Sequence, residues 1–222
     1  MRKALRVTTR VLLLSLVTSA ALVMLLRWVP VRLTPLMLKR AFQGEATALR
    51  PAPLEWVSLE EVSPELVAAV VASEDARFRS HRGFDWTEVR RMRKARRAGD
   101  GTLRGCSTLS QQTAKNVFTF GTRTLTRKAL ETWWTVLIEL LWGKDRILEV
   151  YLNVVETGPG LFGVEAASRH YYGVGARELD LRRAAALAVC LPAPRHFRPD
   201  NLDSGRRRAL ERVMREVSGA GD

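Results

Sequence analysis

The chain has 222 residues, which is enough for one domain of ordinary size with its own core but excludes a second catalytic domain. Its formal net charge at pH 7 is +13, which predicts an anionic partner: nucleic acid, a membrane surface or a phosphorylated substrate. Residues 1–40 contain eight basic residues and no acidic ones, which leaves a net charge of +5 for the rest. The two cysteines, Cys106 and Cys190, have no motif spacing, so neither a metal site nor a disulfide is predicted.

The N-terminal segment combines a basic cluster with a long apolar run. Four basic residues lie in residues 1–10, and residues 11–31 are almost wholly apolar, interrupted by the charged Arg27. At about 1.5 Å per residue this run gives about 30 Å of helix, enough to cross a bilayer core. We therefore predict a cytoplasmic tail at 1–10 and a single transmembrane helix at 11–31, with the rest of the chain across the membrane. A cleaved signal peptide is the alternative, because residues 18–21 are small.

Beyond this segment the sequence predicts a connector and one helical domain. Residues 32–59 contain three prolines and are predicted to lead from the membrane into a domain at residues 60–222. Within that domain the apolar residues recur at helical spacing, and we find no convincing alternating strand pattern and no repeat. The predicted fold class is all-α.

A carboxylate ends the apolar face of the first helix predicted in the domain. Ser63 is a suitable N-cap, Pro64 fits the first helical position, and Glu74 follows on the face formed by Val67, Val70 and Val71. Desolvation at that position would raise the pKa of Glu74 toward the range useful for a general acid or base. The residues alone leave a structural alternative open, which is an ion pair with one of the nearby arginines Arg77, Arg79 and Arg82.

The next segment is strongly basic, with six Lys or Arg residues in residues 90–97. It is predicted to be a helix whose charged face is solvated or lies against anionic lipid headgroups. A nucleic-acid reader is the alternative, but the sequence has no recognisable helix-turn-helix, zinc finger or aromatic RNA-binding pattern.

Two polar clusters follow on predicted helices. In residues 105–118, Thr108 and Gln111 have capping-box spacing. The polar residues of this stretch suit a phosphorylated sugar, or form only a well-capped polar helix; they are Ser107, Thr108, Gln111, Gln112, Lys115 and Asn116.

In residues 124–142, Glu131 approaches the core side of a long helix beside Arg127 and Lys128, and a simple ion pair with Arg127 is the structural alternative. The predicted apolar stripe of that helix is Leu130, Trp134, Leu137, Ile138 and Leu141.

Further helices are predicted at residues 145–153 with Asp145 as the cap, at 181–191 and at 206–217. Taken in order, five segments of the chain resemble the peptidoglycan glycosyltransferases of glycosyltransferase family 51, and within that family the monofunctional transglycosylases. The segments are Glu74-Asp-x-x-Phe78-x-x-His81-x-Gly83, Ser107-Thr-x-x-Gln111-Gln112-x-x-Lys115-Asn116, Arg127-Lys-x-x-Glu131, Lys144-x-x-Ile-Leu-Glu149-x-Tyr151-Leu-Asn153, and Gly163 to Gly173. The Ser-x-x-Lys and Lys-Thr-Gly patterns of a penicillin-binding transpeptidase are absent from the sequence, which predicts no transpeptidase activity.

The resemblance implies a lysozyme-like helical fold that polymerises lipid II into linear glycan strands, with inversion at the donor anomeric carbon and release of undecaprenyl pyrophosphate. Glu74 would be the general base and Glu131 the second acidic residue. Asp75, His81 and Gly83 would support the Glu74 segment. The implied substrate-binding residues are Phe78, Ser107, Thr108, Gln111, Gln112, Lys115, Asn116, Arg123, Arg127 and Lys128.

The resemblance does not imply a required cofactor, but it is compatible with a divalent cation, Mg²⁺ or Mn²⁺, beside Glu131. It implies lipid II, the growing glycan chain, membrane lipids and other cell-wall synthesis proteins as partners, and no nucleic acid. The implied location is the bacterial cytoplasmic (inner) membrane, with the catalytic domain on the periplasmic side. Two residues depart from the family pattern: Cys106 replaces a usual glycine and Arg183 replaces a common acid.

Two other functions remain open at this point. A lysozyme-like glycan-cleaving enzyme would also use a Glu on a helix, although cleavage of an uncharged glycosidic bond requires no cations for a pyrophosphate. A non-catalytic membrane-anchored protein that binds lipid II or glycan would keep the fold without turnover.

Overall fold

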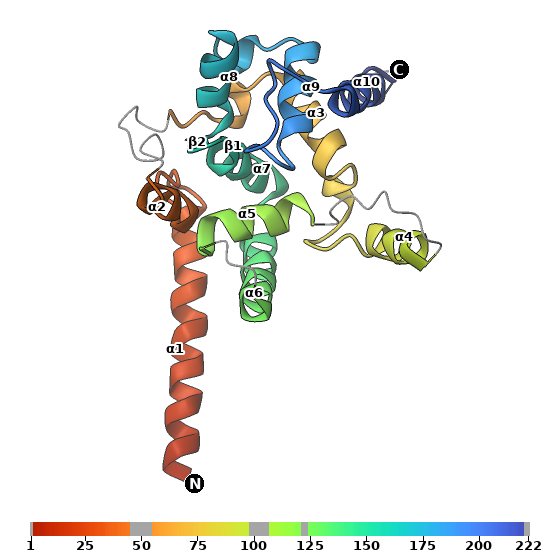
Figure 1. The fold of residues 1–222 in the computed structure, drawn as a ribbon. Helices are drawn as coiled ribbons and strands as arrows, with labels where there is room; N and C mark the ends of the chain where they lie inside the picture. Colours follow the sequence, from red (N-terminus) through yellow and green to blue (C-terminus); the bar gives the residue numbers. More distant parts are fainter. Residues whose placement is uncertain (1, 45–54, 98–106, 121–123, 220–222) are drawn as a thin grey trace.

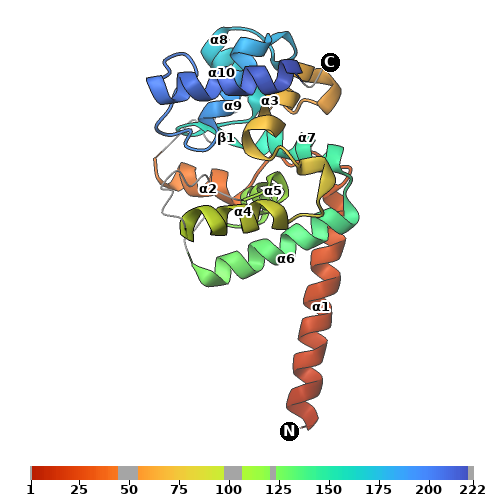
Figure 2. The ribbon, with the colours of Figure 1, turned by 90° about the vertical axis from the view of Figure 1, so that its right-hand side faces the viewer.

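A computed structural model describes residues 2–44, 55–97, 107–120 and 124–219. One long helix, α1 (Arg2–Leu26), extends away from a domain built almost entirely of helices (Figures 1 and 2). The prediction of an all-α domain is confirmed, with one small exception. A two-stranded antiparallel hairpin joins β1 (Glu156–Gly158) to β2 (Leu161–Phe162), and strands this short leave no alternating pattern to detect in a sequence.

The helix α1 is shifted toward the N-terminus relative to the apolar run at 11–31. It ends at Leu26 because Pro30 follows shortly and disfavours helical conformation in the residue before it. Its stretch Leu5–Leu26 is the one part of the described chain that is long and apolar enough to cross a membrane, and nearly all of its side chains are exposed. Two side chains of the domain bind its end: Trp142 Nε1 donates to Val23 O at 2.7 Å, and Arg146 Nη2 donates to Leu26 O at 2.8 Å.

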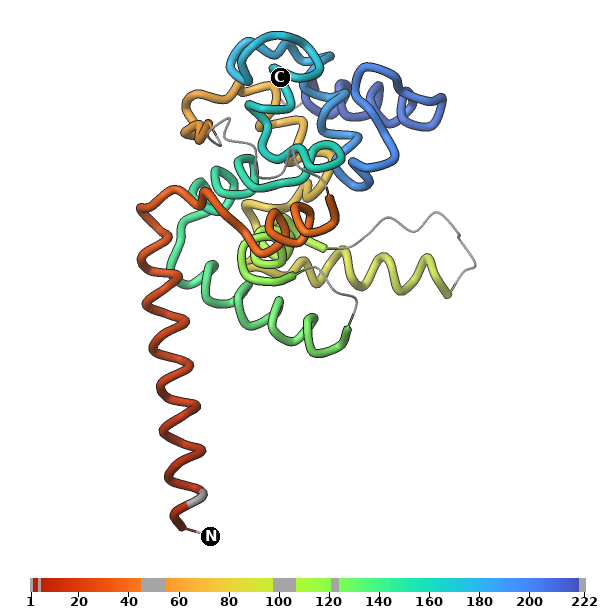
Figure 3. Tube along the Cα trace, turned by 60° about the vertical axis from the view of Figure 1, so that its left-hand side comes forward, coloured from red at the N-terminus to blue at the C-terminus, as the bar shows by residue number. Residues whose placement is uncertain are grey.

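A short helix, α2 (Pro35–Phe42), follows α1 within the stretch predicted as a connector. Thr34 caps it by accepting a hydrogen bond from Met37 N at 3.2 Å, and the Met37 side chain is buried in the domain core. This helix packs against α5 (Leu109–Phe118), as Figure 3 also shows. Part of the 32–59 stretch therefore belongs to the packed domain.

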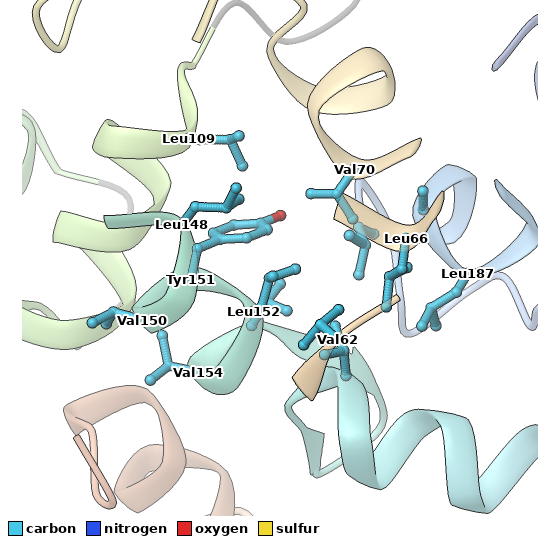
Figure 4. Close-up of a cluster of buried hydrophobic side chains, with 14 of the residues drawn as sticks. Val62, Leu66, Val70, Leu109, Leu148, Val150, Tyr151, Leu152, Val154 and Leu187 are labelled. Atoms are coloured by element: carbon cyan, nitrogen blue, oxygen red, sulfur yellow. The ribbon is translucent and has the colours of Figure 1, made fainter. Parts of the chain in front are cut away.

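Two groups of helices meet in one core. In the first, α3 (Pro64–Glu74) packs against α9 (Leu181–Cys190) and α10 (Ser204–Gly219). In the second, α5 packs against α6 (Leu125–Leu141) and α7 (Lys144–Val154). The shared core is apolar, and Figure 4 shows its members Leu66, Val70, Leu109, Leu148, Tyr151, Leu152 and Leu187. The ends of α3 and α5 therefore meet where the two groups join.

The remaining described elements are the helices α4 (Trp86–Arg97) and α8 (Val164–Tyr172) and the short 3-10 turns η2 (Leu59–Glu61), η3 (Phe78–Ser80) and η4 (Ala176–Glu178). The predicted helices at 181–191 and 206–217 correspond to α9 and α10. The helix predicted from Asp145 begins instead at Lys144 with Gly143 as its N-cap.

The prediction for the apolar stripe of α6 is partly wrong. Leu137 and Ile138 are buried as expected, but Leu130 is 54% exposed. The reason is that α5, α1 and α7, which pack against α6, leave part of its apolar surface uncovered, so the stripe in the core is narrower than the apolar surface of the helix. The exposed part of α6 carries further large apolar side chains, including Leu140, which is 74% exposed.

Candidate active site

Glu74 is the last residue of α3, and its carboxylate faces α5. Its Oε2 accepts a hydrogen bond from Gln112 Nε2 at 2.7 Å, whereas its buried Oε1 has no partner among the described residues. Burial raises the pKa of Glu74; the hydrogen bond from Gln112 and the charges of Lys115 and Arg206 partly oppose this shift. The site thus contains a desolvated carboxylate with one free oxygen.

Glu74 does not form the ion pair with a nearby arginine that was its structural alternative, as far as the described residues show. Arg77 pairs with Asp85 at 3.4 Å, and Arg79 pairs with Asp145 at 2.8 Å. Within the described chain Glu74 makes no salt bridge. Its environment therefore fits an acid or base better than a structural ion pair.

Tyr151 fixes the orientation of Gln112. This tyrosine is fully buried on α7, and its hydroxyl donates to Gln112 Oε1 at 3.5 Å. With its oxygen engaged, the Gln112 amide presents its NH₂ group to Glu74. Burial, and then the negative charge of Glu74, hold the pKa of Tyr151 well above its ordinary value, so its hydroxyl keeps its proton as a donor. Tyr151 belongs to one of the sequence motifs but was not among the predicted site residues.

Asp75 connects the end of α3 to the start of α5. Its Oδ2 accepts a hydrogen bond from Leu109 N at 2.9 Å, and His81 Nε2 lies 3.0 Å from both of its carboxylate oxygens. Because Leu109 is the first residue of α5, the Asp75 carboxylate also lies where the helix dipole favours a negative charge. These contacts fit the predicted supporting role of Asp75 and His81.

Gly83 makes the next connection between the two segments. Its carbonyl accepts a hydrogen bond from Thr108 Oγ1 at 2.6 Å. Its φ angle is +86°, and a Cβ atom there would lie 3.0 Å from Thr135 Cγ2. Both the conformation and the lack of space require glycine at this position.

A cavity of about 180 Å³ lies beside this arrangement, between α5 and α6. Its lining combines neutral donors, three cations and one carboxylate: Ser107, Gln112, Lys115, Arg127, Lys128 and Glu131. All six are predicted site residues, drawn from two separate motifs. A larger hollow of about 540 Å³ lies along α3 and η2, but its lining is mostly aliphatic and contains none of the predicted site residues. The smaller cavity is therefore the candidate site.

Glu131 is the buried member of an ion cluster in this cavity. Its side chain is 3% exposed, and its two oxygens bind Arg127 Nη1 at 2.5 Å and Lys128 Nζ at 2.6 Å. Lys115 makes no such direct pair within the described chain. Burial lowers its pKa, and the charge of Glu131 is the largest opposing effect, followed among carboxylates by that of Glu74. Lys115 thus lies within the electrostatic influence of both carboxylates.

Among the described residues, the other predicted site residues do not line the cavity. Phe78 is fully buried, with Lys144 Nζ 4.5 Å from its ring centroid. Thr108 and Gln111 form the expected capping box, in which Thr108 N donates to Gln111 Oε1 at 3.1 Å. Asn116 is also buried. Thr108, Gln111 and Asn116 thus belong to α5 and its N-cap, whereas Phe78 lies on η3. Arg123 and Cys106 lie outside the described residues, and Cys190 is a buried free thiol.

A second, partly buried network supports the same segments and was not predicted. Glu139 Oε1 accepts hydrogen bonds from Ser110 Oγ and from Lys144 Nζ, the latter at 2.6 Å. The Glu139 Cγ also lies against Gly83. Three helices and the turn after α3 therefore converge on one carboxylate. Lys144 lies in a recognised motif, but Glu139 carried no sequence signal because its partners are distant along the chain.

The cavity does not present the donor set of a protein-bound divalent cation. Both oxygens of Glu131 are already bound by cations, and no group of three His, Cys, Asp or Glu side chains converges within the described residues. Mg²⁺ and Mn²⁺ prefer several carboxylate or other oxygen ligands. We therefore derive no reaction step through a metal ion.

Comparisons with known proteins agree with these features. The family model described as "Transglycosylase" matches residues 43–218. A protein of Rhodospirillum centenum is 51% identical over 180 residues, which cover 81% of this chain and 76% of the relative. A protein of Chromohalobacter salexigens is 44% identical over 209 residues (91% and 88%), and one of Stutzerimonas stutzeri is 43% identical over 219 residues (96% and 89%). Each of these relatives bears the name biosynthetic peptidoglycan transglycosylase.

Proposed function

The chain belongs to the transglycosylase family, a family of lysozyme-like fold, and from that premise we propose how Glu74 and the cation-lined cavity carry out its peptidoglycan glycosyltransferase activity. The substrate is lipid II, and the product is a linear glycan strand. The observation that carries the proposal is the juxtaposition of a desolvated, unpaired carboxylate with a cavity containing Lys115, Arg127 and Lys128. The first suits proton abstraction, and the second suits a pyrophosphate.

In the proposed reaction, Glu74 is the general base. The 4-hydroxyl oxygen of the acceptor sugar attacks the anomeric carbon of the donor, and its proton passes to Glu74 as the new glycosidic bond forms. The bond from the anomeric carbon to the pyrophosphate oxygen breaks on the opposite face, so the configuration inverts. Because Gln112 occupies Oε2, the unpartnered Oε1 is the oxygen available for the proton.

The cations of the cavity stabilise the leaving group. Negative charge grows on undecaprenyl pyrophosphate as it departs, and fixed positive charges in a partly desolvated site act on it without reorganisation. Glu131 binds Arg127 and Lys128 from one side and so holds their side chains in position. Lys115 lacks such a partner among the described residues and is the cation most available to the phosphate oxygens.

The helix α1 supplies the membrane location that a polyprenyl substrate requires. Its apolar stretch has the length of a membrane span, and the basic residues within its first ten residues favour a cytoplasmic N-terminus. The domain then lies on the outer side of the bacterial cytoplasmic membrane. The lipid tail of the substrate stays in the bilayer while its sugar and phosphate groups enter the cavity.

A glycan-cleaving enzyme is the second candidate, because a Glu at a helix end is also suited to glycoside hydrolysis. The cation set of the cavity disfavours it, since an uncharged glycosidic bond leaves no phosphate to stabilise. A non-catalytic binding protein is disfavoured because the chain has both of the carboxylates proposed for catalysis, Glu74 and Glu131.

The purified full chain, incubated with lipid II in detergent, tests the proposal. We expect the wild type to form glycan polymer and Glu74→Gln to form almost none, because the amide cannot take the proton. Glu65→Gln is the matched control, since Glu65 is exposed in the first turn of the same helix. Polymer formation by Glu74→Gln at the wild-type rate would remove Glu74 as the base. Cleavage of glycan without polymerisation would favour the second candidate.

A further inference from the structure

The helix α4 has a composition that its surroundings in the domain do not explain. Its twelve residues contain six basic side chains and one acidic one, Glu88, and none of its residues is buried. Its start is well defined, because Asp85 Oδ1 accepts hydrogen bonds from Thr87 N at 2.9 Å and Glu88 N at 3.0 Å. The helix is therefore capped by the domain but not covered by the other elements of the described structure.

An exposed helix of this length and charge is poorly stable in water by itself. Isolated helices shorter than about 12–15 residues are marginal. Like charges three or four positions apart destabilise a helix further, and α4 contains such pairs, for example Arg90 with Arg93 and Arg93 with Arg97. The only ion pair within the helix joins Arg91 to Glu88 at 3.8 Å. A partner with negative charge would relieve the repulsion.

The position of α4 indicates what that partner is. Figures 1 and 2 show α4 and α6 in the part of the domain that lies toward α1, whereas α9 and α10 lie at the far end. At the start of α4 Trp86 is 62% exposed and stacks on Phe84 with ring centroids 5.9 Å apart. The helix α6, whose Thr135 and Glu139 lie against Gly83 in the turn before α4, exposes Trp133 and Leu140. Positive charge beside exposed aromatic and aliphatic side chains matches a bilayer interface, and it does not match a soluble polyanion.

We propose that α4 binds the anionic phospholipid headgroups of the bilayer that α1 enters. The arginines and Lys94 lie on the headgroups, and Trp86 marks the boundary with the apolar region. This contact goes beyond the proposed function, because it concerns the bulk lipid and needs neither lipid II nor Glu74. It makes the order of α4 depend on the lipid composition of the membrane.

Hydrogen exchange of the α4 amides measures this order in the full chain. The protein is reconstituted without lipid II into vesicles of phosphatidylcholine alone or of phosphatidylcholine with phosphatidylglycerol. We expect the α4 amides to exchange at least about tenfold more slowly with the anionic lipid, because each basic side chain near such a surface contributes attraction. High salt should reverse the effect by screening.

Charge-matched variants separate α4 from a general effect of positive charge. Removing three cations from α4, in the triple variant Arg90→Gln/Arg93→Gln/Arg97→Gln, should abolish the lipid-dependent protection. The control triple variant Arg182→Gln/Arg208→Gln/Arg215→Gln removes three exposed cations from α9 and α10, at the far end of the domain, and should behave as wild type. The substituted α4 residues are exposed, so the domain should still unfold at the wild-type temperature; if it does not, the three single substitutions replace the triple variant.

Three outcomes would overturn the proposal. They are equal exchange in the two kinds of vesicle, loss of protection in the control variant but not in the α4 variant, and protection by an oligonucleotide in neutral vesicles without any by phosphatidylglycerol. The test is independent of the proposed function. Glu74→Gln should keep the lipid-dependent protection of α4 even though it forms no polymer.

Discussion

Replacing Gln112 by Met removes the strongest interaction that holds Glu74 ionised. The Gln112 amide donates to Glu74 Oε2 at 2.7 Å, and among the effects that lower the pKa of this buried carboxylate it is the largest. Methionine has a similar length and no donor. A hydrogen bond to a charged group contributes about 1.5–3 kcal/mol, and about 1.4 kcal/mol corresponds to one pKa unit. The pKa of Glu74 should therefore rise, because the loss of this hydrogen bond disfavours the ionised form.

The sign of the effect on catalysis follows from the role of Glu74 as a base. A base is active when it is deprotonated, so a higher pKa moves the acid limb of the pH–rate profile to higher pH. The assay is the initial rate of lipid II polymerisation, plotted as kcat/KM against pH, because that parameter reports the free enzyme. A uniform loss of substrate binding at Gln112 would lower kcat/KM at every pH but would leave the position of the acid limb unchanged.

Gln43→Met is the control for this experiment, because it is the same chemical change at an exposed position in the C-cap of α2. Its profile should overlay the wild-type profile. An acid limb that stays in place in folded Gln112→Met protein, or that moves to lower pH, would refute the assignment of Glu74 as the base whose protonation controls the rate.

Two further substitutions test the supporting geometry. Gly83→Ala should destabilise the fold more than Gly173→Ala, because Gly173 has a similar positive φ but open space around it. In urea unfolding, Gly173→Ala should lower the free energy of unfolding by about 1–2 kcal/mol. Equal losses for the two variants would contradict the close contact of Gly83 with Thr135. Glu131→Gln should lower the free energy of unfolding by about 1–3 kcal/mol, because Arg127 and Lys128 lose their buried, charged partner. It should also reduce polymerisation strongly, and a variant as stable and active as wild type would show that the ion cluster has no role.

Local signals in the sequence were sufficient for much of the fold. Ser63 caps α3 by accepting a hydrogen bond from Leu66 N at 3.1 Å, and Thr108 caps α5 in the predicted capping box. Both interactions involve residues three positions apart, so the sequence contains all the information they need.

What the sequence did not show depends on contacts between distant residues. Leu130 has the spacing of a core residue, but no element covers that side of α6 in the described structure. Phe78 lies in a motif, and a motif cannot distinguish a side chain that touches substrate from one that packs beneath the site. Glu139 gathers Ser110 and Lys144 from two other helices, an arrangement that becomes visible only in three dimensions.

The same difference between local signals and contacts of distant residues applies to the candidate site. The sequence grouped Glu74 with the helix end and Lys115 with a polar cluster, but the cavity that unites α5 with the Glu131 cluster arises from the packing of α5 on α6. The interaction of Gln112 with both Glu74 and Tyr151 likewise joins three helices. These contacts explain why a carboxylate that the sequence left ambiguous has the environment of a base.

The polymerisation rate of Glu74→Gln, measured with lipid II beside the wild type and Glu65→Gln, tests the central claim most directly. The account predicts glycan polymer from the wild type and from Glu65→Gln, and a loss of at least about a hundredfold in rate for Glu74→Gln, the range expected when a general base is removed. A folded Glu74→Gln protein that polymerises lipid II at the wild-type rate would contradict it.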